Sequence, residues 1–202
     1  MGKIKFTKAE LKHQQEAKRQ YERFLPTLQL KKQQLQLEVR MSADQLEANE
    51  AAQRRMAEAA EGFVALYGDD ELDRIAREAV RIAGVRRGSA NIAGITVPTF
   101  DRVEFAPTEW DLFATDWCVD DLIAALREAL SLRCAHAVLE EQHRLLADEL
   151  RSTTQRVNLF EKVKIPEAKE NIRLIQISIS DNDIAAVARS KIAIKKLQEP
   201  AA

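Results

Sequence analysis

With 202 residues the chain could hold one or two domains, but 5% aromatic and 31% charged residues are typical of long helices rather than of an ordinary globular core. A formal net charge of −1 gives no argument for nucleic-acid binding. The sequence has no apolar run near the ~20 residues that cross a membrane, no signal-peptide core and no CxxC pair. Together these features predict a reduced, cytoplasmic chain without direct membrane insertion.

Residues 1–67 are predicted to form one long N-terminal helix. From Tyr21 to Tyr67, apolar or aromatic residues occupy ten of the fourteen positions that follow each other in steps of four and three. This heptad seam predicts a coiled coil, because so narrow a stripe needs a partner helix to cover it. Pro26 predicts a kink or local break, since it removes a backbone donor and crowds the preceding turn. The polar seam positions, which are expected to fix the register, are Lys32, Ser42, Asn49 and Gln53.

Residues 68–109 are predicted to form an insertion between two long helices. Glu71–Ile82 has the spacing of a short amphipathic helix. Asn91–Phe105 changes to a period of two, is rich in β-branched residues and contains Pro98, which predicts two strands of a small hairpin. Because an isolated two-stranded hairpin is marginal in water, we expect it to lean on the flanking helices or on another protein.

Residues 110–202 are predicted to form the second long helix. From Leu146 to Ile179, apolar residues again recur in steps of four and three. Pro166 predicts a second kink. If the chain folds back at the insertion, this helix covers the first one within a single elongated domain. The predicted fold class is therefore all-α dominated: a long antiparallel two-helix coiled coil with a short helix and a small β-hairpin inserted in the middle. An intermolecular coiled coil fits the periodicity equally well.

The charges are unevenly distributed although they nearly cancel. Residues 1–40 carry ten Lys or Arg against four Glu, and residues 101–121 carry seven acidic residues against one Arg. In the fold-back arrangement both termini lie at a basic end, and the insertion lies near an acidic one. This asymmetry suits different partners at the two ends, and solvated helix faces explain it as well.

Motifs for catalysis are missing from the sequence, which has no Walker A, GxSxG, HExxH or GxGxxG pattern. His136, Glu140 and His143 share one helical face and could in principle hold a metal ion, but three such residues more often form a polar surface. We therefore predict that the chain is not an enzyme, and that it has no catalytic residues, no cofactor and no metal site.

Four segments carry a likeness to a known family. They are Leu25-Pro-Thr-Leu-Gln-Leu-Lys-Lys-Gln-Gln-Leu-Gln-Leu-Glu, Asn91-Ile-Ala-Gly-Ile-Thr-Val-Pro, Asn158-Leu-Phe-Glu-Lys-Val-Lys-Ile-Pro-Glu-Ala-Lys-Glu-Asn-Ile-Arg and Ala186-Val-Ala-Arg-Ser-Lys-Ile-Ala-Ile-Lys-Lys-Leu. In this order they resemble the first helix, the hairpin region, the second helix and the C-terminal end of the D subunits of V-type (A/V-type) ATPases and ATP synthases. The resemblance covers nearly the whole chain and is greatest to the bacterial forms.

This resemblance implies a central-stalk rotor protein of a V/A-type rotary ATPase or ATP synthase. Its coiled coil would enter the hexamer of catalytic A and non-catalytic B subunits, its middle would bind the F subunit, and its foot would sit on the C (or d) subunit of the membrane rotor. Turning would couple ATP hydrolysis or synthesis to proton or sodium transport, and the sequence leaves the ion and the direction open. The implied location is cytoplasmic, peripheral to the cytoplasmic face of the inner (plasma) membrane.

Two groups of residues are the predicted partner contacts. The expected contacts with the hexamer are the basic residues near both termini: Lys3, Lys5, Lys8, Lys12, Arg189, Lys191, Lys195 and Lys196. The expected contacts with the F subunit or at the foot are the apolar residues of the insertion and of the segment that follows it: Ile75, Ile92, Ile95, Val97, Phe105, Trp110 and Trp117.

Three other functions compete with the rotor interpretation. A free-standing coiled-coil scaffold or homodimer would show the same heptads, but it would not need the hairpin or the basic end. The shaft of an F-type enzyme shares the mechanics, but it carries a larger domain between its helices. An enzyme acting through His136 and His143 ranks last.

Overall fold

The computed structural model of the chain describes residues 5–64, 74, 77–107 and 119–198. Its packing divides the chain into two units, one made of residues 1–32 and 152–202 and the other of residues 33–151. Each unit contains part of the first long helix and part of the last ones, and the two units are described separately below. None of the helices in the described parts of the chain is long and apolar enough to cross a membrane.

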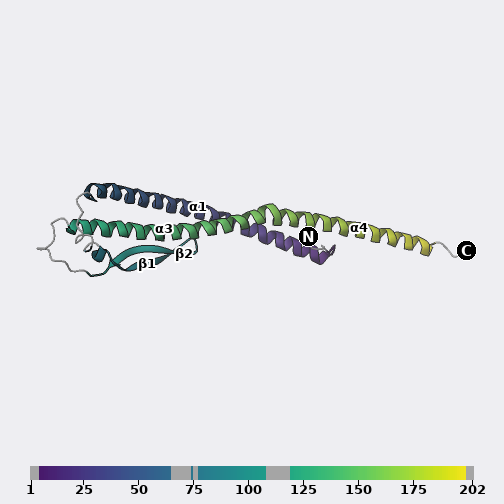
Figure 1. The fold of residues 1–202 in the computed structure, drawn as a ribbon. Coiled ribbons are helices and arrows are strands. Elements are labelled where there is room, and N and C mark those ends of the chain that lie inside the picture. The colour runs from purple at the N-terminus through teal and green to yellow at the C-terminus, as the bar shows by residue number, and fades with distance from the viewer. Residues whose placement is uncertain (1–4, 65–73, 75–76, 108–118, 199–202) are drawn as a thin grey trace. The chain divides into compact units, whose positions relative to one another are not determined.

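Helix α1 spans Lys8–Val64 without interruption (Figure 1). Thr7 precedes its first residue, and the Thr7 hydroxyl accepts a hydrogen bond from the Glu10 backbone N–H, as an N-cap does. Pro26 lies inside the helix, which continues through it, so the local break considered for this position does not occur. The Thr27 hydroxyl donates to the Phe24 carbonyl oxygen one turn back, at 2.8 Å, which satisfies a backbone acceptor next to the proline.

The second half of the chain is helical as α3 (Val119–Leu159) and α4 (Ile165–Gln198), joined by a π-helical turn at Phe160–Lys164. Ile165 donates its backbone N–H to the Phe160 oxygen, five residues back. The turn inserts one extra residue, because buried Val157 and buried Ile165 are eight positions apart where a heptad has seven. The turn therefore keeps the apolar face of α4 in phase with that of α3, and Pro166 follows at the start of α4.

The predicted antiparallel fold-back is confirmed within each unit. In the unit formed by residues 1–32 and 152–202, the Tyr21 and Phe160 rings lie 5.3 Å apart. In the unit formed by residues 33–151, Leu35 and Leu146 are fully buried in one cluster. The predicted seam is confirmed from Tyr21 to Met56, where each of its positions is buried or half-buried, but Ala60 is exposed. Phe63 and Tyr67, its last two positions, have no described side chain.

The hairpin consists of β1 (Ile82–Ile92) and β2 (Ile95–Phe105), paired antiparallel from Ile82↔Phe105 to Ile92↔Ile95. Ala93 and Gly94 form the turn with φ values of 51° and 83°, as a two-residue type I′ turn requires. The side-chain oxygen of Asn91 accepts a hydrogen bond from the Gly94 N–H at 3.0 Å.

The position predicted for this hairpin was wrong in part. Both strands were expected within Asn91–Phe105, but the first strand begins nine residues earlier, at Ile82. The glycines of β1 belong to the strand. A Cβ on Gly88 would lie 2.7 Å from the Thr99 hydroxyl oxygen, so a larger residue here would force the Thr99 side chain to move. The short helix expected over Glu71–Ile82 is helical at 74 and 77–79 among the residues described, and it ends before Ile82.

The hairpin packs against both long helices of its unit. Val97 of β2 is fully buried together with Leu35 of α1 and Leu146 of α3. At its base, the Arg127 side chain of α3 donates to the Ala79 carbonyl oxygen at 3.0 Å and lies over the Phe105 ring at 5.2 Å. The insertion is therefore held by its own chain, which is one of the two supports expected from the sequence.

Candidate partner-binding surfaces

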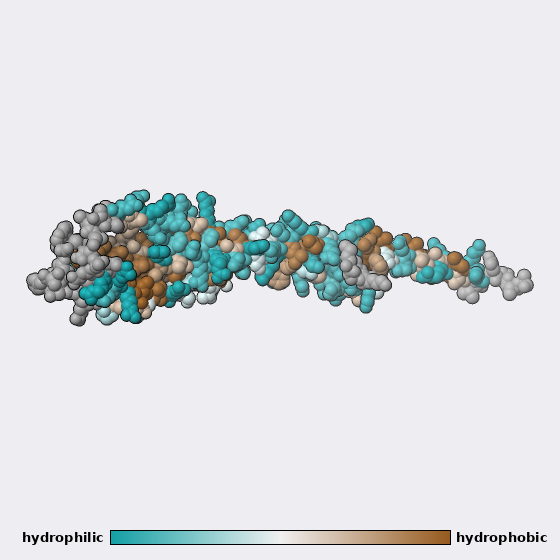
Figure 2. Space-filling model, viewed as in Figure 1, coloured by the Kyte–Doolittle hydropathy of each residue, from teal (hydrophilic) through white to brown (hydrophobic). Residues whose placement is uncertain are grey.

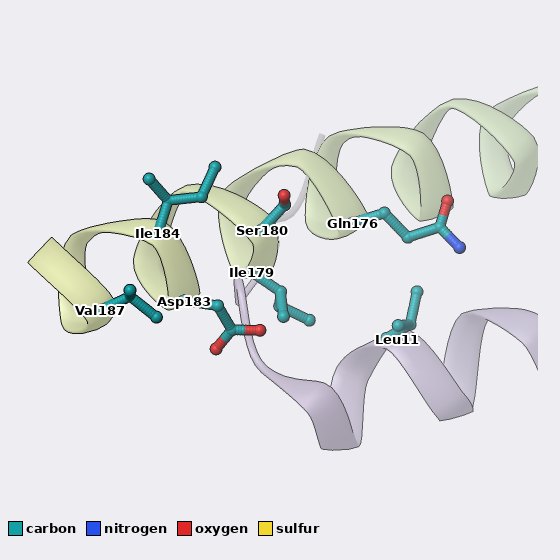
Figure 3. Close-up of a pocket in the computed structure, with 7 residues that line it drawn as sticks. All are labelled: Leu11, Gln176, Ile179, Ser180, Asp183, Ile184 and Val187. Carbon is teal, nitrogen blue, oxygen red and sulfur yellow. The ribbon is translucent and has the colours of Figure 1, made fainter.

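An open apolar groove lies where the first turns of α1 meet α4. Its volume is about 470 Å³, and Leu11 of α1 faces Ile179 of α4 across it. Figure 3 shows the Leu11 and Ile179 side chains pointing into the space between the two helices, with Asp183 beside them and Ile184 pointing away. The groove continues the coiled-coil seam, but no α1 residue among those described covers α4 beyond this level. It is therefore an open end of the seam rather than a closed core.

Beyond this groove, residues 184–196 of α4 present exposed apolar and basic side chains and no acidic ones. Ile184 is 65% exposed, Val187 56% and Ile192 57%. Figure 2 shows such apolar residues as brown areas alternating with hydrophilic ones along this helix. Apolar residues spread around a helix in this way suit contact on more than one side. The basic residues that accompany them, all exposed, are Arg189, Lys191, Lys195 and Lys196.

The predicted basic residues near the N-terminus lie beside a different part of α4 from the part that carries the basic residues near the C-terminus. Lys8 and Lys12 are exposed on the first turns of α1, near Leu11, and Lys12 forms an ion pair with Glu16 at 3.9 Å. From Asp183, beside Leu11, to Lys195 the helix rises by roughly 18 Å at 1.5 Å per residue. Lys5 is exposed before α1, and Lys3 lies outside the described residues. The structure thus separates two sets of cations that the sequence analysis combined.

The predicted apolar contacts of the insertion differ in accessibility. Val97 is fully buried in the hairpin core, and Ile92 and Ile95 are half-buried against it. Phe105 is half-buried and carries the Arg127 guanidinium on its ring. These side chains therefore support the hairpin, and of these four the half-buried ones retain surface for a partner. Ile75, Trp110 and Trp117 lie outside the described residues.

The two histidines considered as metal ligands each contact another side chain instead. Nδ1 of His143 lies 2.7 Å from the buried Ser42 hydroxyl oxygen across α1 and α3. Nε2 of His136 lies 3.5 Å from a Glu140 carboxylate oxygen. Among the residues that the structure describes, no three His, Cys, Asp or Glu side chains are grouped to hold a metal ion. On α4, the exposed Arg173 side chain donates hydrogen bonds to the Glu170 carboxylate, and this contact lowers the pKa of Glu170.

The sequence analysis missed two parts of these surfaces. Leu11 was not included in the seam, although it lies ten residues before Tyr21. That distance is one heptad of seven residues plus one step of three, so Leu11 continues the seam. The Ser42–His143 contact was not predicted, because the pairing of two polar seam positions depends on a register that one helix alone does not reveal. Only the first of the two had a signal in the sequence.

Comparison with known proteins places this arrangement in a family. The family model of the ATP synthase D subunit matches residues 10–195, which include both long helices, the hairpin and most of the exposed end of α4. The chain belongs to the ATP synthase D-subunit family. Membership agrees with the resemblance read from the four sequence segments.

Similar proteins cover nearly the whole chain. The V-type ATP synthase D subunit of Borreliella burgdorferi is 38% identical over 98% of this chain and 96% of its own length. The protein of the same name from Chlamydia muridarum is 37% identical, over 98% of each chain. That from Chlamydia caviae is 36% identical, over 98% of this chain and 95% of its own. At these coverages the similarity includes the segments of both long helices and of the hairpin.

Proposed function

We propose that the chain is the central-stalk rotor protein of a V/A-type rotary ATPase or ATP synthase. In this role it couples ATP hydrolysis or synthesis in a hexamer of A and B subunits to proton or sodium transport through a membrane ring. It is a non-catalytic component, and it works at the cytoplasmic face of the plasma membrane without entering the membrane. The relatives, which are named as D subunits of V-type ATP synthases, support the membership of such an assembly.

The observation that carries the proposal is the seam, which the chain covers by itself. Leu35 of α1 is fully buried against Leu146 of α3 and Val97 of β2, all within one chain. A paired helix can transmit torque, because twisting one helix relative to the other would expose the apolar seam. The exposed basic and apolar end of α4 is then available for the hexamer.

Two other partners are assigned to the remaining regions. We assign the F subunit and the C (or d) subunit of the membrane rotor to the hairpin and its base, where Ile92, Ile95 and Phe105 keep part of their surface. The contacts predicted at Ile75, Trp110 and Trp117 belong to the same proposal.

The alternative, a free-standing scaffold or homodimer, is less well supported. A homodimer would use the α1 seam between two chains, but in this chain α3 and the hairpin already cover that seam at Leu35 and Ser42. An intermolecular coiled coil would require the hairpin core to open.

The decisive experiment measures ATP hydrolysis by the purified A–B hexamer with and without this chain and its F subunit, followed by size-exclusion chromatography. We expect co-elution with the hexamer and a changed turnover. Elution of the chain alone as a dimer, with turnover unchanged, would replace the rotor proposal with the scaffold.

A further inference from the structure

Strand β1 has an outer edge that no other strand covers in the part of the chain that the structure describes. The sheet consists of β1 and β2 alone, so each strand has one outer edge. Ile92 and Ile95 flank the two-residue turn and therefore form a hydrogen-bonded pair. Hydrogen-bonded and non-hydrogen-bonded pairs alternate from there, so the backbone N–H and C=O groups of Arg87, Ser89 and Asn91 point away from β2.

These outward backbone groups are free to bind another chain. Within the described residues, Arg87, Ser89 and Asn91 make no backbone hydrogen bond to any element outside the hairpin. Gly88 between them is also exposed, so the edge is open to solvent along this stretch. A row of unpaired backbone donors and acceptors is the template on which an extended segment adds as a further strand. The edge therefore fits a strand rather than a helix.

The outer edge of β2 is closed to such pairing. By the same alternation, Thr96, Pro98 and Phe100 are its outward-pointing residues. Pro98 has no N–H to donate, and it lies directly opposite Ser89. Pro98 and Phe100 are half-buried, whereas Ser89 is exposed. Because proline on an edge strand blocks the addition of another strand, the sheet can grow only on the β1 side.

The charges of the hairpin indicate an acidic segment as the added strand. Strand β1 contains Arg86 and Arg87 and no acidic residue. Arg86 lies opposite Arg102, and both guanidinium groups contact the single carboxylate of Glu104. Like charges directly opposite each other destabilise a sheet, so a second carboxylate on an added strand would give each of these arginines its own partner. Arg87 is already paired with Glu141 of α3, at 3.3 Å.

A second copy of this chain is a poorer occupant of the edge. Two β1 strands paired about a two-fold axis would bring the arginines of both copies into one sheet, and β1 supplies no carboxylate to offset them. A partner with its own acidic residues does not meet this repulsion.

We infer that the F subunit adds an extended segment, with at least one Asp or Glu, to the outer edge of β1 over residues 86–91. The inference rests on the proposed function, which assigns the F subunit to the hairpin. It adds to that assignment the edge that is used, the pairing of backbone groups and the charge of the incoming segment.

The test measures binding of the purified F subunit to the full chain by calorimetry. Ser89→Pro removes an outward N–H that the β1–β2 pairing does not use. Thr96→Pro is the matched control, because it removes an outward N–H from the other edge, at an exposed residue. Ser89→Ala removes the hydroxyl and keeps the N–H. We expect Ser89→Pro to raise the Kd by about tenfold or more and both controls to stay within about twofold.

A second pair of substitutions tests the acidic character of the segment. Arg86→Gln removes a positive charge from β1, and Arg102→Gln removes one from β2 while leaving Arg86 with Glu104. We expect Arg86→Gln to raise the Kd by about threefold or more at low salt, with the difference shrinking as salt is added, and Arg102→Gln to have a smaller effect. A Kd that does not depend on the charge at Arg86 at any salt concentration would overturn the acidic segment.

Amide hydrogen exchange, followed by NMR, measures the backbone pairing in the unsubstituted chain and therefore does not depend on how the proline variants fold. With the F subunit bound, we expect exchange to slow by about tenfold or more at Arg87, Ser89 and Asn91. The amides of Gly88 and Ala90 already point to β2 and should change less.

Several outcomes would contradict the inference. It is overturned if Ser89→Pro binds as the unsubstituted chain does, if Ser89→Ala weakens binding equally, or if exchange at the three outward amides is unchanged in the complex. Slower exchange that appears without the F subunit and grows with chain concentration would assign the edge to a second copy instead. Binding without protection of these amides leaves the rotor proposal standing, whereas no binding of the F subunit at all would overturn the proposed function as well.

Discussion

Two buried hydroxyl groups in the helical seam differ in their hydrogen bonding. Ser42 is 2% exposed, and its oxygen lies 2.9 Å from the Val39 carbonyl oxygen and 2.7 Å from Nδ1 of His143. Because a hydroxyl has one proton and a carbonyl can only accept, both contacts form together when Nδ1 of His143 donates. Thr153 is 1% exposed, and its hydroxyl oxygen has no hydrogen-bond partner among the described residues. One residue thus specifies a contact between helices, and the other leaves a polar atom unsatisfied.

Replacing Thr153 with Val should stabilise the chain. Valine has nearly the same shape and removes the buried hydroxyl that lacks a partner, so we expect the free energy of unfolding to rise by about 1 kcal/mol. Thr153→Ser keeps the hydroxyl and loses a methyl group, and it should lower this free energy by about 1 kcal/mol. Urea unfolding followed by circular dichroism measures both, and a loss of stability in the Val variant would show that the hydroxyl has a partner.

Replacing Ser42 with Ala should destabilise the chain by about 1–2 kcal/mol, because His143 loses its partner across the two helices. In a double-mutant cycle with His143→Phe, the second substitution should cost less when Ser42 is already Ala, with a coupling free energy of about 1 kcal/mol. The measurement is the urea midpoint of the four proteins. Additive effects would mean that the 2.7 Å contact contributes nothing to stability.

At the scale of elements, the chain accommodates two prolines in different ways. Pro26 lies inside α1, exposed, and the helix continues through it without the donor that a proline lacks. Pro166 follows the π-helical turn Phe160–Lys164 and is the second residue of α4, in the first turn of that helix, where a missing N–H costs little. The same residue type therefore has a different energetic cost at the two positions.

Substituting Pro26 with Ala should raise the free energy of unfolding by about 1–3 kcal/mol, because a regular helical hydrogen bond becomes available and the crowding is removed. The loss of proline rigidity in the unfolded chain offsets part of this gain. Pro166→Ala should change it by less than about 1 kcal/mol, which makes it the internal comparison. Urea unfolding of the two variants checks the order, and an equal or larger gain at Pro166 would contradict the account of the π-helical turn.

At the scale of the whole molecule, a net charge of −1 conceals a strong local imbalance. The exposed end of α4 has four basic residues and no acidic one between residues 184 and 196. Exposed charges act over about 8–10 Å at 0.10–0.15 M salt, so such a cluster acts on partners close to it. The apolar residues Ile184 and Val187 add a component that does not depend on salt.

Reversing Lys191, Lys195 and Lys196 to Glu together should weaken binding to the A–B hexamer at least tenfold at low salt, with the difference shrinking as salt is raised. The dissociation constant across a salt series measures this effect. The control reverses Arg54, Arg55 and Arg151, which are exposed within the unit of residues 33–151. Affinity that is unchanged at every ionic strength would exclude a role for these lysines at the hexamer.

Predictability differed from one element to the next for identifiable reasons. The α1 seam was predictable because seven-residue periodicity is local information that each turn repeats. The hairpin was predicted but misplaced, because the period of two is clear only from Asn91 onward, whereas β1 begins at Ile82 and includes Gly84 and Gly88. The π-helical turn had no predicted counterpart, since its one extra residue has meaning only against a partner helix.

The helical class, the heptad stripes, the presence of a hairpin and the family could all be inferred without coordinates, because each depends on residues near one another in the chain or on recurring motifs. The tertiary structure decided what covers each stripe. It buried Val97 with Leu35 and Leu146, placed Ser42 against His143, and left Ala60 and Ala125 open. Burial depends on contacts between residues about 50 to 110 positions apart, and the spacing of residues along one helix does not contain that information.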